Sequence, residues 1–237
     1  MSKKKLFSLA VVVIMIAILS MSTLAWFSDS DSVKNDFMIA DSDDDTADEI
    51  FSVDVWENTP DGDQDQDGHT YENVLPGDVL KKEAVVENTG YYDQYVRVTV
   101  TVSDAAAWMA ALNTNGAVPD LGQIVDGWDN ADTWYCVDAA KVVGDSIVYT
   151  MYYRNILLGD IENDNDNVSF NADKVTVFTA VKIPASMTVA QAAAFQSNFN
   201  ITVKAEAVQT ENLGIDTSSG YAADKAFAVV EADHPIA

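Results

Sequence analysis

The stretch that decides the fold runs from Tyr95 to Val102 and reads YVRVTVTV. Valine occupies every second position, and Tyr95, Arg97, Thr99 and Thr101 lie between the valines. Successive side chains of a β-strand point to opposite faces, so this alternation predicts a strand with one buried face and one polar face.

The same alternation recurs along the chain on both sides of this stretch. Residues 51–56, 147–153, 175–183 and 201–207 repeat it, and residues 80–86 repeat it more weakly. Turn signals separate these runs at Pro76-Gly77-Asp78, Asn88-Thr89-Gly90 and Val143-Gly144-Asp145. Several alternating strands with turns between them predict an all-β fold built as an antiparallel sandwich.

Two or three short helices are expected in the connections. Asp104 is placed to cap a helix over residues 105–112, and Thr188 with Gln191 makes a capping box for residues 189–196. A third helix is expected over residues 222–231. We therefore expect one sandwich domain over residues 50–212, preceded by an arm and acidic linker over 26–49 and followed by a tail over 213–237.

The first 25 residues have the layout of a secretory signal peptide. Lys3, Lys4 and Lys5 form a positive start, an apolar run follows, and Thr23 and Ala25 are small residues at a cleavage site. Cleavage between Ala25 and Trp26 would give an exported protein that begins with Trp26-Phe27. The alternative is an uncleaved membrane anchor, because the uncharged run is about long enough to span a bilayer.

The charge balance excludes some partners. The chain has a formal net charge of −25, and removal of the three N-terminal lysines would make it −28. Such a charge repels nucleic acid and anionic lipid, so no nucleic-acid partner is expected. Cys136 is the only cysteine, so the chain can form no internal disulfide. Its apolar surroundings predict a buried, unreactive thiol, and the alternative is a disulfide to another molecule.

The motifs of common enzymes are missing from the sequence. There is no H-E-x-x-H zinc helix, no G-x-S-x-G elbow, no phosphate-binding loop and no dinucleotide-binding glycine pattern. The two histidines, His69 and His234, are far apart in sequence. We therefore expect no catalytic residues and a non-enzymatic role.

One acidic loop has the spacing of calcium ligands. Asp61, Asp63, Asp65, Asp67 and Glu72 alternate with other residues and could direct several carboxylate oxygens at one Ca²⁺ ion. An EF-hand loop requires glycine at position 6, and no register of this loop satisfies both the glycine and the final acid. The loop therefore indicates either a calcium site of a β-protein or a solvated acidic hairpin. Residues 162–167 (ENDNDN) are a second, weaker candidate.

Three groups of motifs resemble those of one family. The first is the junction Thr23-Leu24-Ala25-Trp26-Phe27-Ser28-Asp29. The second is Leu75-Pro76-Gly77-Asp78, followed by Val86-Glu87-Asn88-Thr89-Gly90 and Tyr95-Val96-Arg97-Val98, and the third is the strand ITVKAEAVQ at the end of the domain. In this order they resemble the TasA/camelysin family of exported Gram-positive proteins, whose signal peptides are cut by a signal peptidase of the SipW type. Residues 105–171 take no part in the resemblance.

The resemblance implies a jelly-roll-like sandwich that polymerises head to tail into extracellular fibres of the biofilm matrix. It also implies that the N-terminal segment of one copy completes a sheet of the next, with a minor anchoring subunit as a further partner. The expected donor-strand residues are Trp26, Phe27, Val33, Phe37 and Ile39. Open sheet edges can accept such a strand, and head-to-tail contacts do not close.

Three alternatives remain at the level of sequence. Trp26 and Phe27 could pack on their own domain, or simply mark the cleavage site. The protein could be a monomeric calcium-binding protein of the cell surface or of adhesion. The name camelysin carries a claim of secreted metalloprotease activity, which the missing zinc motif disfavours.

Overall fold

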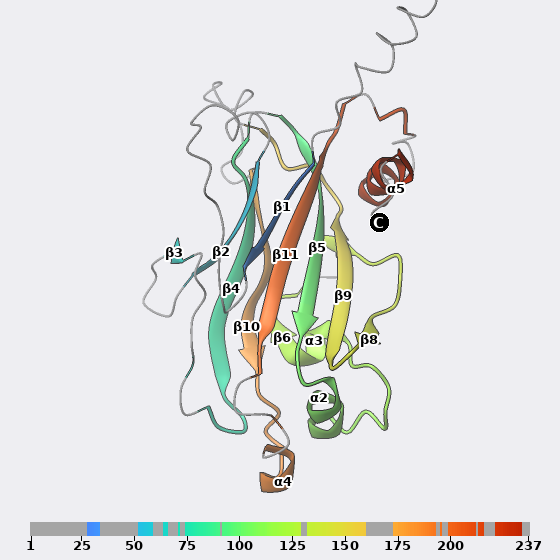
Figure 1. The fold of residues 1–237 in the computed structure, drawn as a ribbon. Coiled ribbons are helices and arrows are strands. Elements are labelled where there is room, and N and C mark those ends of the chain that lie inside the picture. Colours follow the sequence, from blue (N-terminus) through green and yellow to red (C-terminus); the bar gives the residue numbers. More distant parts are fainter. Residues whose placement is uncertain are drawn as a thin grey trace, which may run out of the picture.

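A computed structural model gives the fold of the chain (Figure 1). It describes residues 28–33, 52–58, 64–65, 71, 74–90, 92–128, 132–159, 173–192, 195, 199–211, 213–215 and 221–233, with the backbone alone for 28–33, 64–65, 189 and 233. Within these residues the protein is built mainly of antiparallel strands, as the sequence predicts.

The strands form two sheets. The first sheet has the order β1-β11-β5-β9-β7, with β8 also paired to β9, and the second has the order β3-β2-β4-β10-β6. In chain order the strands are β1 (Ser28–Val33), β2 (Val53–Asn58), β3 (Gln64–Asp65), β4 (Val79–Asn88), β5 (Gln94–Val102), β6 (Val125–Asp126), β7 (Trp134–Tyr135), β8 (Lys141–Val143), β9 (Ser146–Tyr153), β10 (Lys174–Lys182) and β11 (Ile201–Gln209). The six strands predicted from alternation are confirmed as β2, β4, β5, β9, β10 and β11.

The alternation produces the core. Val96, Val98, Val100 and Val102 of β5 are all fully buried, and the residues between them are only half-buried. These valines face buried residues of the second sheet, such as Val55 and Val86, within one hydrophobic cluster. One continuous core therefore lies between the two sheets.

The turns follow the local chemistry read from the sequence. Gly77 has a φ of 94°, which disfavours a side chain, and Asp78 closes the turn by accepting a hydrogen bond from the Leu75 amide at 2.7 Å. Gly144, with a φ of 61°, lies in the short turn that joins β8 to β9. The Gly144 turn fixes the register of the β8–β9 hairpin, in which Val143 is opposite Ser146.

The helices are short and lie outside the sheets: α2 (Ala105–Ala111), α3 (Leu121–Ile124), α4 (Val189–Ala192) and α5 (Ala223–Asp233). The helix after Asp104 is confirmed, but the predicted cap is wrong. Asp104 adopts a left-handed conformation with φ 57°, makes no side-chain cap and accepts a hydrogen bond from the Ser103 hydroxyl. The Thr188–Gln191 capping box is formed, since the Thr188 hydroxyl accepts from the Gln191 amide and Gln191 Oε1 accepts from the Thr188 amide.

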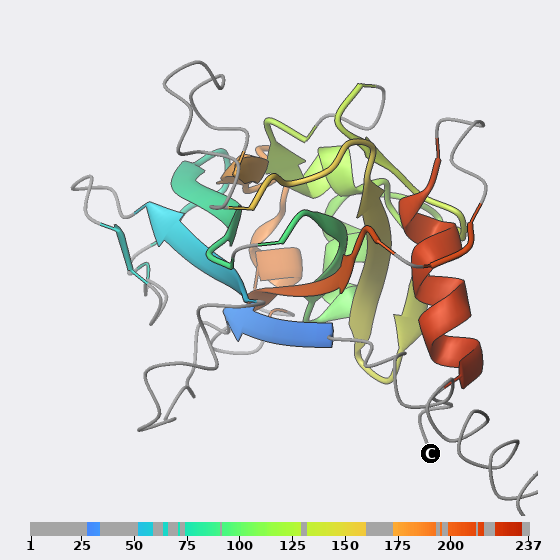
Figure 2. The ribbon, with the colours of Figure 1, turned by 90° about the horizontal axis from the view of Figure 1, so that it is seen from above.

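The helix α5 covers the outer face of the first sheet (Figure 2). Its Phe227 packs in a second hydrophobic cluster with Tyr95, Val208 and Leu213. The Arg97 guanidinium lies 4.4 Å from the centre of the Phe227 ring and pairs with Glu231 of the same helix. The C-terminal part of the chain therefore packs against β5 and β11 through both apolar and ionic contacts.

Candidate functional site

The candidate functional site is the edge of the first sheet formed by β1 and β11, because the N-terminal strand β1 joins the fold there. On one side β11 pairs with β5 over nine positions, from Ile201 opposite Val102 to Gln209 opposite Gln94. On its other side it pairs with β1 over six positions, from Ser28 opposite Val208 to Val33 opposite Val203. Figure 1 shows β1 along this outer flank of β11.

The strand β1 has a composition unlike that of its neighbours. Its sequence is SDSDSV, and serine and aspartate are both poor strand formers. It also lies against β2, the nearest strand of the second sheet. β1 therefore lies along the seam between the sheets, which is the line where β1 and β11 of the first sheet contact β2 of the second. Its serines and aspartates contribute little intrinsic preference for the strand.

A buried ion pair joins β2 and β4 in the second sheet, next to this seam. Lys82 of β4 donates to Glu57 Oε1 of β2, and both side chains are 2% exposed. Burial lowers the pKa of Lys82, and the charge of Glu57 offsets part of that effect. No described residue donates a hydrogen bond to Glu57 Oε2, although this atom is buried.

Tyr71 belongs to the same group of contacts. Its hydroxyl donates to the Lys81 carbonyl, and burial together with the charge of Glu57 raises the pKa of Tyr71 to about 12. The phenol therefore stays protonated at physiological pH. The pair of Lys82 and Glu57 was not predicted from the sequence. A signal was present, because Lys82 lies on the same alternation as the apolar residues of β4 (Leu80, Ala84 and Val86) and is therefore expected to face the core.

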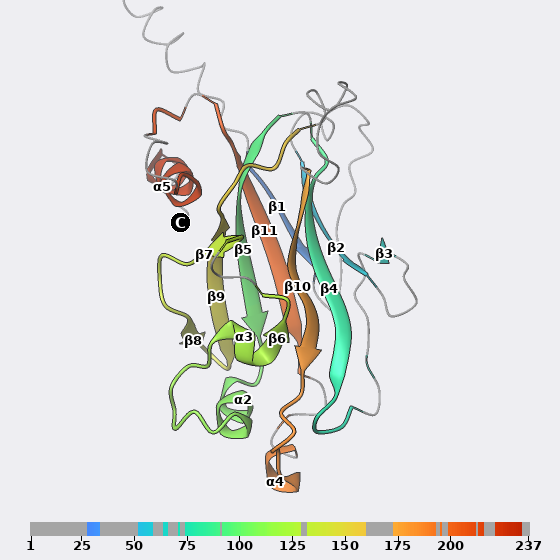
Figure 3. The same cartoon turned by 180° about the vertical axis from the view of Figure 1, so that it is seen from behind.

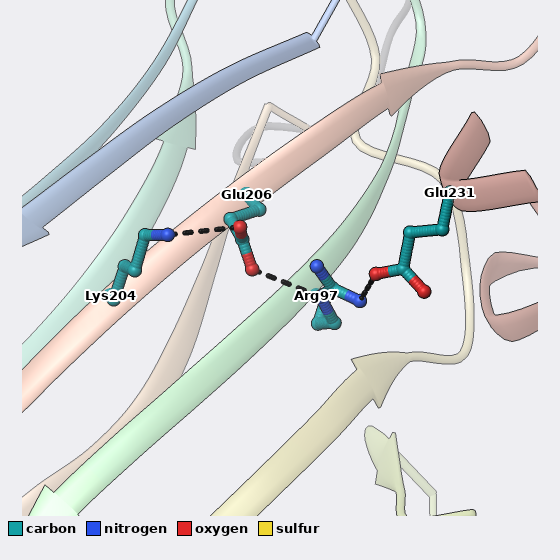
Figure 4. A network of polar contacts seen from close by, with 4 residues as sticks. All are labelled: Arg97, Lys204, Glu206 and Glu231. Carbon is teal, nitrogen blue, oxygen red and sulfur yellow. Dashed lines mark hydrogen bonds and ion pairs between the residues drawn. The ribbon is translucent and has the colours of Figure 1, made fainter. Parts of the chain in front are cut away.

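An ionic network on the outer face ties β11 to β5 and α5 (Figure 4). Glu206 accepts from Arg97 Nε at 3.0 Å and pairs with Lys204 Nζ at 2.9 Å. Burial alone would raise the pKa of Glu206, but the bonds from Lys204 and Arg97 outweigh it and lower the pKa. Burial alone would lower the pKa of Arg97, but the hydrogen bonds and charges of Glu231 and Glu206 raise it, so the network is ionised at neutral pH.

A cavity of about 820 Å³ is lined by residues of β7, β9 and the connections beside them. These two strands lie at the end of the first sheet away from β1 (Figure 3). Its lining includes Tyr135, Tyr149, Arg154 and Tyr221, and the Arg154 guanidinium lies 4.9 Å from the centre of the Tyr221 ring. Tyr149 donates a hydrogen bond to the Pro119 carbonyl at 2.9 Å. These contacts hold aromatic side chains along the cavity wall, which also carries Asp120, Cys136, Asp138 and Asp224.

Cys136 lines the same cavity, and the prediction that it is buried is wrong. The residue is exposed, because β7 ends at Tyr135 and Cys136 begins the connection that follows. Its thiol is partly shielded at the cavity wall, and this burial together with the nearby charge of Asp120 raises its pKa. The thiol is therefore accessible but mostly protonated at neutral pH.

Many of the residues predicted to act lie outside the described part of the chain. These are the signal peptide with Ala25, the aromatic pair Trp26 and Phe27, the arm residues Phe37 and Ile39, and the calcium-loop residues Asp61, Asp63, Asp67 and Glu72. The loop of residues 162–167 lies outside it too. Val33 is the last residue of β1, and Asp65 has only its backbone described, in β3.

The described residues form neither a metal-binding cluster nor a helix that could span a membrane. No group of three or more histidine, cysteine or acidic residues within them is arranged to hold a metal ion. No helix formed by them is both long enough and apolar enough to cross a membrane.

Comparisons with known proteins add no identification. No family model matches the chain, no curated protein matches it, and no solved structure matches it.

Proposed function

We propose that this chain is a secreted structural protein, the subunit of extracellular fibres of the biofilm matrix. The copies assemble head to tail when the N-terminal strand of one copy is added to a sheet of the next. The observation that carries this proposal is the position of β1: an N-terminal strand of poor strand formers at the edge of β11, over the seam between the sheets. An edge strand at a chain terminus is the element that copies exchange at lowest cost.

The segment that follows β1 is long enough for β1 to be exchanged between copies. Residues 34–52 separate Val33 from Val53, where the sandwich continues with β2. Such a segment of 19 residues can span up to about 60 Å when extended. It is therefore long enough for the same strand to pair with β11 of its own copy or with β11 of a neighbouring one.

The energetics make assembly conditional. Each large apolar side chain of the arm contributes roughly 1.5–3 kcal/mol when buried in a groove. Ordering the arm costs about 1–2 kcal/mol per residue. These terms nearly cancel, so the hydrogen bonds along β11 and the fit of Trp26, Phe27, Val33, Phe37 and Ile39 decide whether the strand stays with its own copy or leaves it.

The rest of the proposal follows the resemblance. The two antiparallel sheets are the core of a jelly-roll-like sandwich, and a signal peptidase of the SipW type cuts between Ala25 and Trp26. Export then exposes the arm only outside the cell. Partners are further copies of the chain and a minor anchoring subunit.

Electron microscopy of the secreted form tests the proposal. We expect filaments from the protein that starts at Trp26, and none from a form that starts at Ile50. The Trp26→Ala/Phe27→Ala variant should lower the sedimenting fraction at least tenfold. Circular dichroism controls for folding, and filaments of the same kind from a folded Ile50 form would contradict strand donation.

A second candidate function is a monomeric calcium-binding protein of the cell surface. The observation that favours it is the pairing of β1 with β11 of the same copy, which leaves no vacant flank on β11. Calcium titration of the wild type and of the Asp63→Ala/Asp65→Ala variant tests the loop, because only a true site would lose its binding. A protein that remains monomeric with and without calcium would support this candidate over the fibre. A casein hydrolysis assay on the same samples tests the protease alternative.

A further inference from the structure

The cavity beside β7 and β9 has the size of a small-ligand site. Its volume of about 820 Å³ falls within the roughly 300–1,000 Å³ that is usual for such sites. Its wall combines these two strands with segments far apart in the chain, at the start of α3, after β7 and around the start of α5. Because β7 and β9 lie at the end of the first sheet away from β1 (Figure 3), the cavity does not depend on which copy supplies β1.

Two aromatic side chains of the wall are partly exposed, and each packs against a second ring. Tyr221 is 46% exposed, and the centre of its ring lies 4.7 Å from that of Tyr135. Trp128 is half-buried and stacks on Trp134, with 6.2 Å between the ring centres. Tyrosine and tryptophan side chains fixed in this way offer apolar contact area to a ligand at a small cost in conformational entropy.

The polar part of the wall is rich in hydrogen-bond acceptors. Asp120, Asp138 and Asp224 line the cavity, and an ionised carboxylate can only accept hydrogen bonds. Asp120 Oδ1 accepts from the Gly122 amide at 2.9 Å, and Asp224 Oδ1 accepts from the Tyr135 hydroxyl at 2.8 Å. Within the part of the chain that the structure describes, no donor bonds to the second oxygen of either carboxylate or to the side chain of Asp138. These oxygens can therefore accept hydrogen bonds from the hydroxyl groups of a ligand.

The charges of the wall select the class of ligand. The lining has three aspartates and one arginine, and the whole chain has a net charge of −25, so an anionic ligand is repelled. An organic cation would compete with Arg154 for the tyrosines, because the Arg154 guanidinium lies 5.5 Å from the centre of the Tyr135 ring and 4.9 Å from that of Tyr221. A neutral ring that carries hydroxyl groups meets neither obstacle.

We propose that this cavity binds a neutral saccharide, either as a free oligosaccharide or as part of a polysaccharide. The apolar C–H faces of the sugar rings contact Trp128 and Tyr221. The sugar hydroxyl groups donate hydrogen bonds to Asp138 and to the second oxygens of Asp120 and Asp224. This binding goes beyond the proposed fibre function, because it uses neither β1 nor the flank of β11.

Titration calorimetry of the secreted form with maltotriose, cellotriose and tri-N-acetylchitotriose tests the proposal. The test variants are Trp128→Ala, Tyr221→Ala and Asp138→Ala, and circular dichroism controls for folding. The last two replace exposed residues, so they keep the test valid if Trp128→Ala fails to fold. Tyr92→Ala is the matched control, because Tyr92 is also 46% exposed and does not line the cavity. Co-sedimentation with starch, cellulose and chitin reports whether the same sugar units are bound within a polymer.

We expect at least one of the trisaccharides to bind, and each folded cavity variant to weaken that binding by about tenfold. Tyr92→Ala should leave the affinity unchanged. No binding of any trisaccharide would overturn the proposal. Binding that is unchanged in all the folded cavity variants would also overturn it, because the sugar would then bind elsewhere.

Tetramethylammonium chloride is the probe for the competing class of ligand. If Tyr221→Ala abolishes binding of this cation and no trisaccharide binds, the cavity is a cation site and the saccharide proposal is wrong. The fibre function is tested separately: saccharide binding without filaments contradicts only the fibre, and filaments without saccharide binding contradict only the saccharide site.

Discussion

The two flanks of β11 differ in the length of the strand pairing and in the composition of the paired strand. On the β5 flank, nine residue pairs join two strands whose core-facing residues are apolar from Val96 to Val102 and from Ile201 to Ala207. On the β1 flank, six pairs join β11 to a strand with the sequence SDSDSV, in which Val33 is the one apolar residue. The pairing of β11 with β5 is therefore stabilised by the hydrophobic core as well as by backbone hydrogen bonds. The pairing with β1 has fewer residue pairs and a strand poor in apolar residues.

The β5 flank also has an ionic network on its outer face. There Glu206 is ionised and bonded to Arg97 and Lys204, so acid removes a favourable contact. Acid is therefore expected to weaken the packing of α5, because Arg97 also pairs with Glu231 of that helix.

The largest effect is expected from a charge placed on the buried face of β5. Val100→Asp puts a carboxylate at a fully buried position of β5, and we expect it to lower the free energy of unfolding by more than about 4 kcal/mol. Urea denaturation followed by circular dichroism measures the loss. Thr99→Asp is the matched control, because residue 99 is half-buried on the outer face opposite Lys204. A similar loss in the control would show that β5 does not depend on its inner face.

The next effect concerns the ion pair beside the seam. Lys82→Met leaves Glu57 buried without its lysine, and we expect a loss of about 3–5 kcal/mol in the free energy of unfolding. The double variant Glu57→Met/Lys82→Met should recover most of this loss, since both charges are then gone. Denaturation of the two variants and the wild type gives the comparison. Equal stability of the single and double variants would mean that the pair is not buried in solution.

A smaller effect is expected where the outer network holds α5. Glu206→Gln removes a charge-assisted bond to Arg97, and we expect a loss of about 1–2 kcal/mol at neutral pH. Because the pKa of Glu206 is lowered in the folded state, the wild type should lose this contribution as the pH falls below about 4, and the variant should not. Thermal unfolding at several pH values measures the difference. Parallel pH curves would contradict the role given to Glu206.

The smallest effect is expected at the cavity beside β7. Cys136→Ser should change the free energy of unfolding by less than about 0.5 kcal/mol, because the residue is exposed and begins a connection. A thiol reagent should modify Cys136 in the native protein, and the rate should rise with pH because its pKa is raised. A native thiol that does not react at any pH would show that the cavity wall covers it.

Sequence reasoning found the long strands because their signal is local. The alternation at residues 95–102, 147–153 and 201–207 needs no knowledge of the neighbours, and the strands β5, β9 and β11 formed where it predicted them. It did not find β7 or β8, since two or three residues carry too little periodicity to stand out. It placed a cap at Asp104 from residue type alone, whereas the backbone there is left-handed and rules that cap out.

The candidate site was predicted only in part. The arm, with Val33 in it, was singled out because it is an isolated group of apolar residues in an acidic segment. The register that sets Asp29 and Asp31 opposite Ala207 and Ala205 could not be predicted, because the alternation of serine and aspartate in β1 permits either face to turn inward. The pairing of Lys82 with Glu57 joins two strands 25 residues apart and was likewise invisible.

By itself the sequence determined the class of fold, because burying every second residue of five or six segments leaves few arrangements other than packed antiparallel sheets. It also determined the strong negative charge and the acidic arm. Only the tertiary structure decided which strand lies beside which, and hence that β1 lies along the outer flank of β11. Strand order and register depend on contacts between residues far apart in the chain, and no local pattern of side chains encodes them.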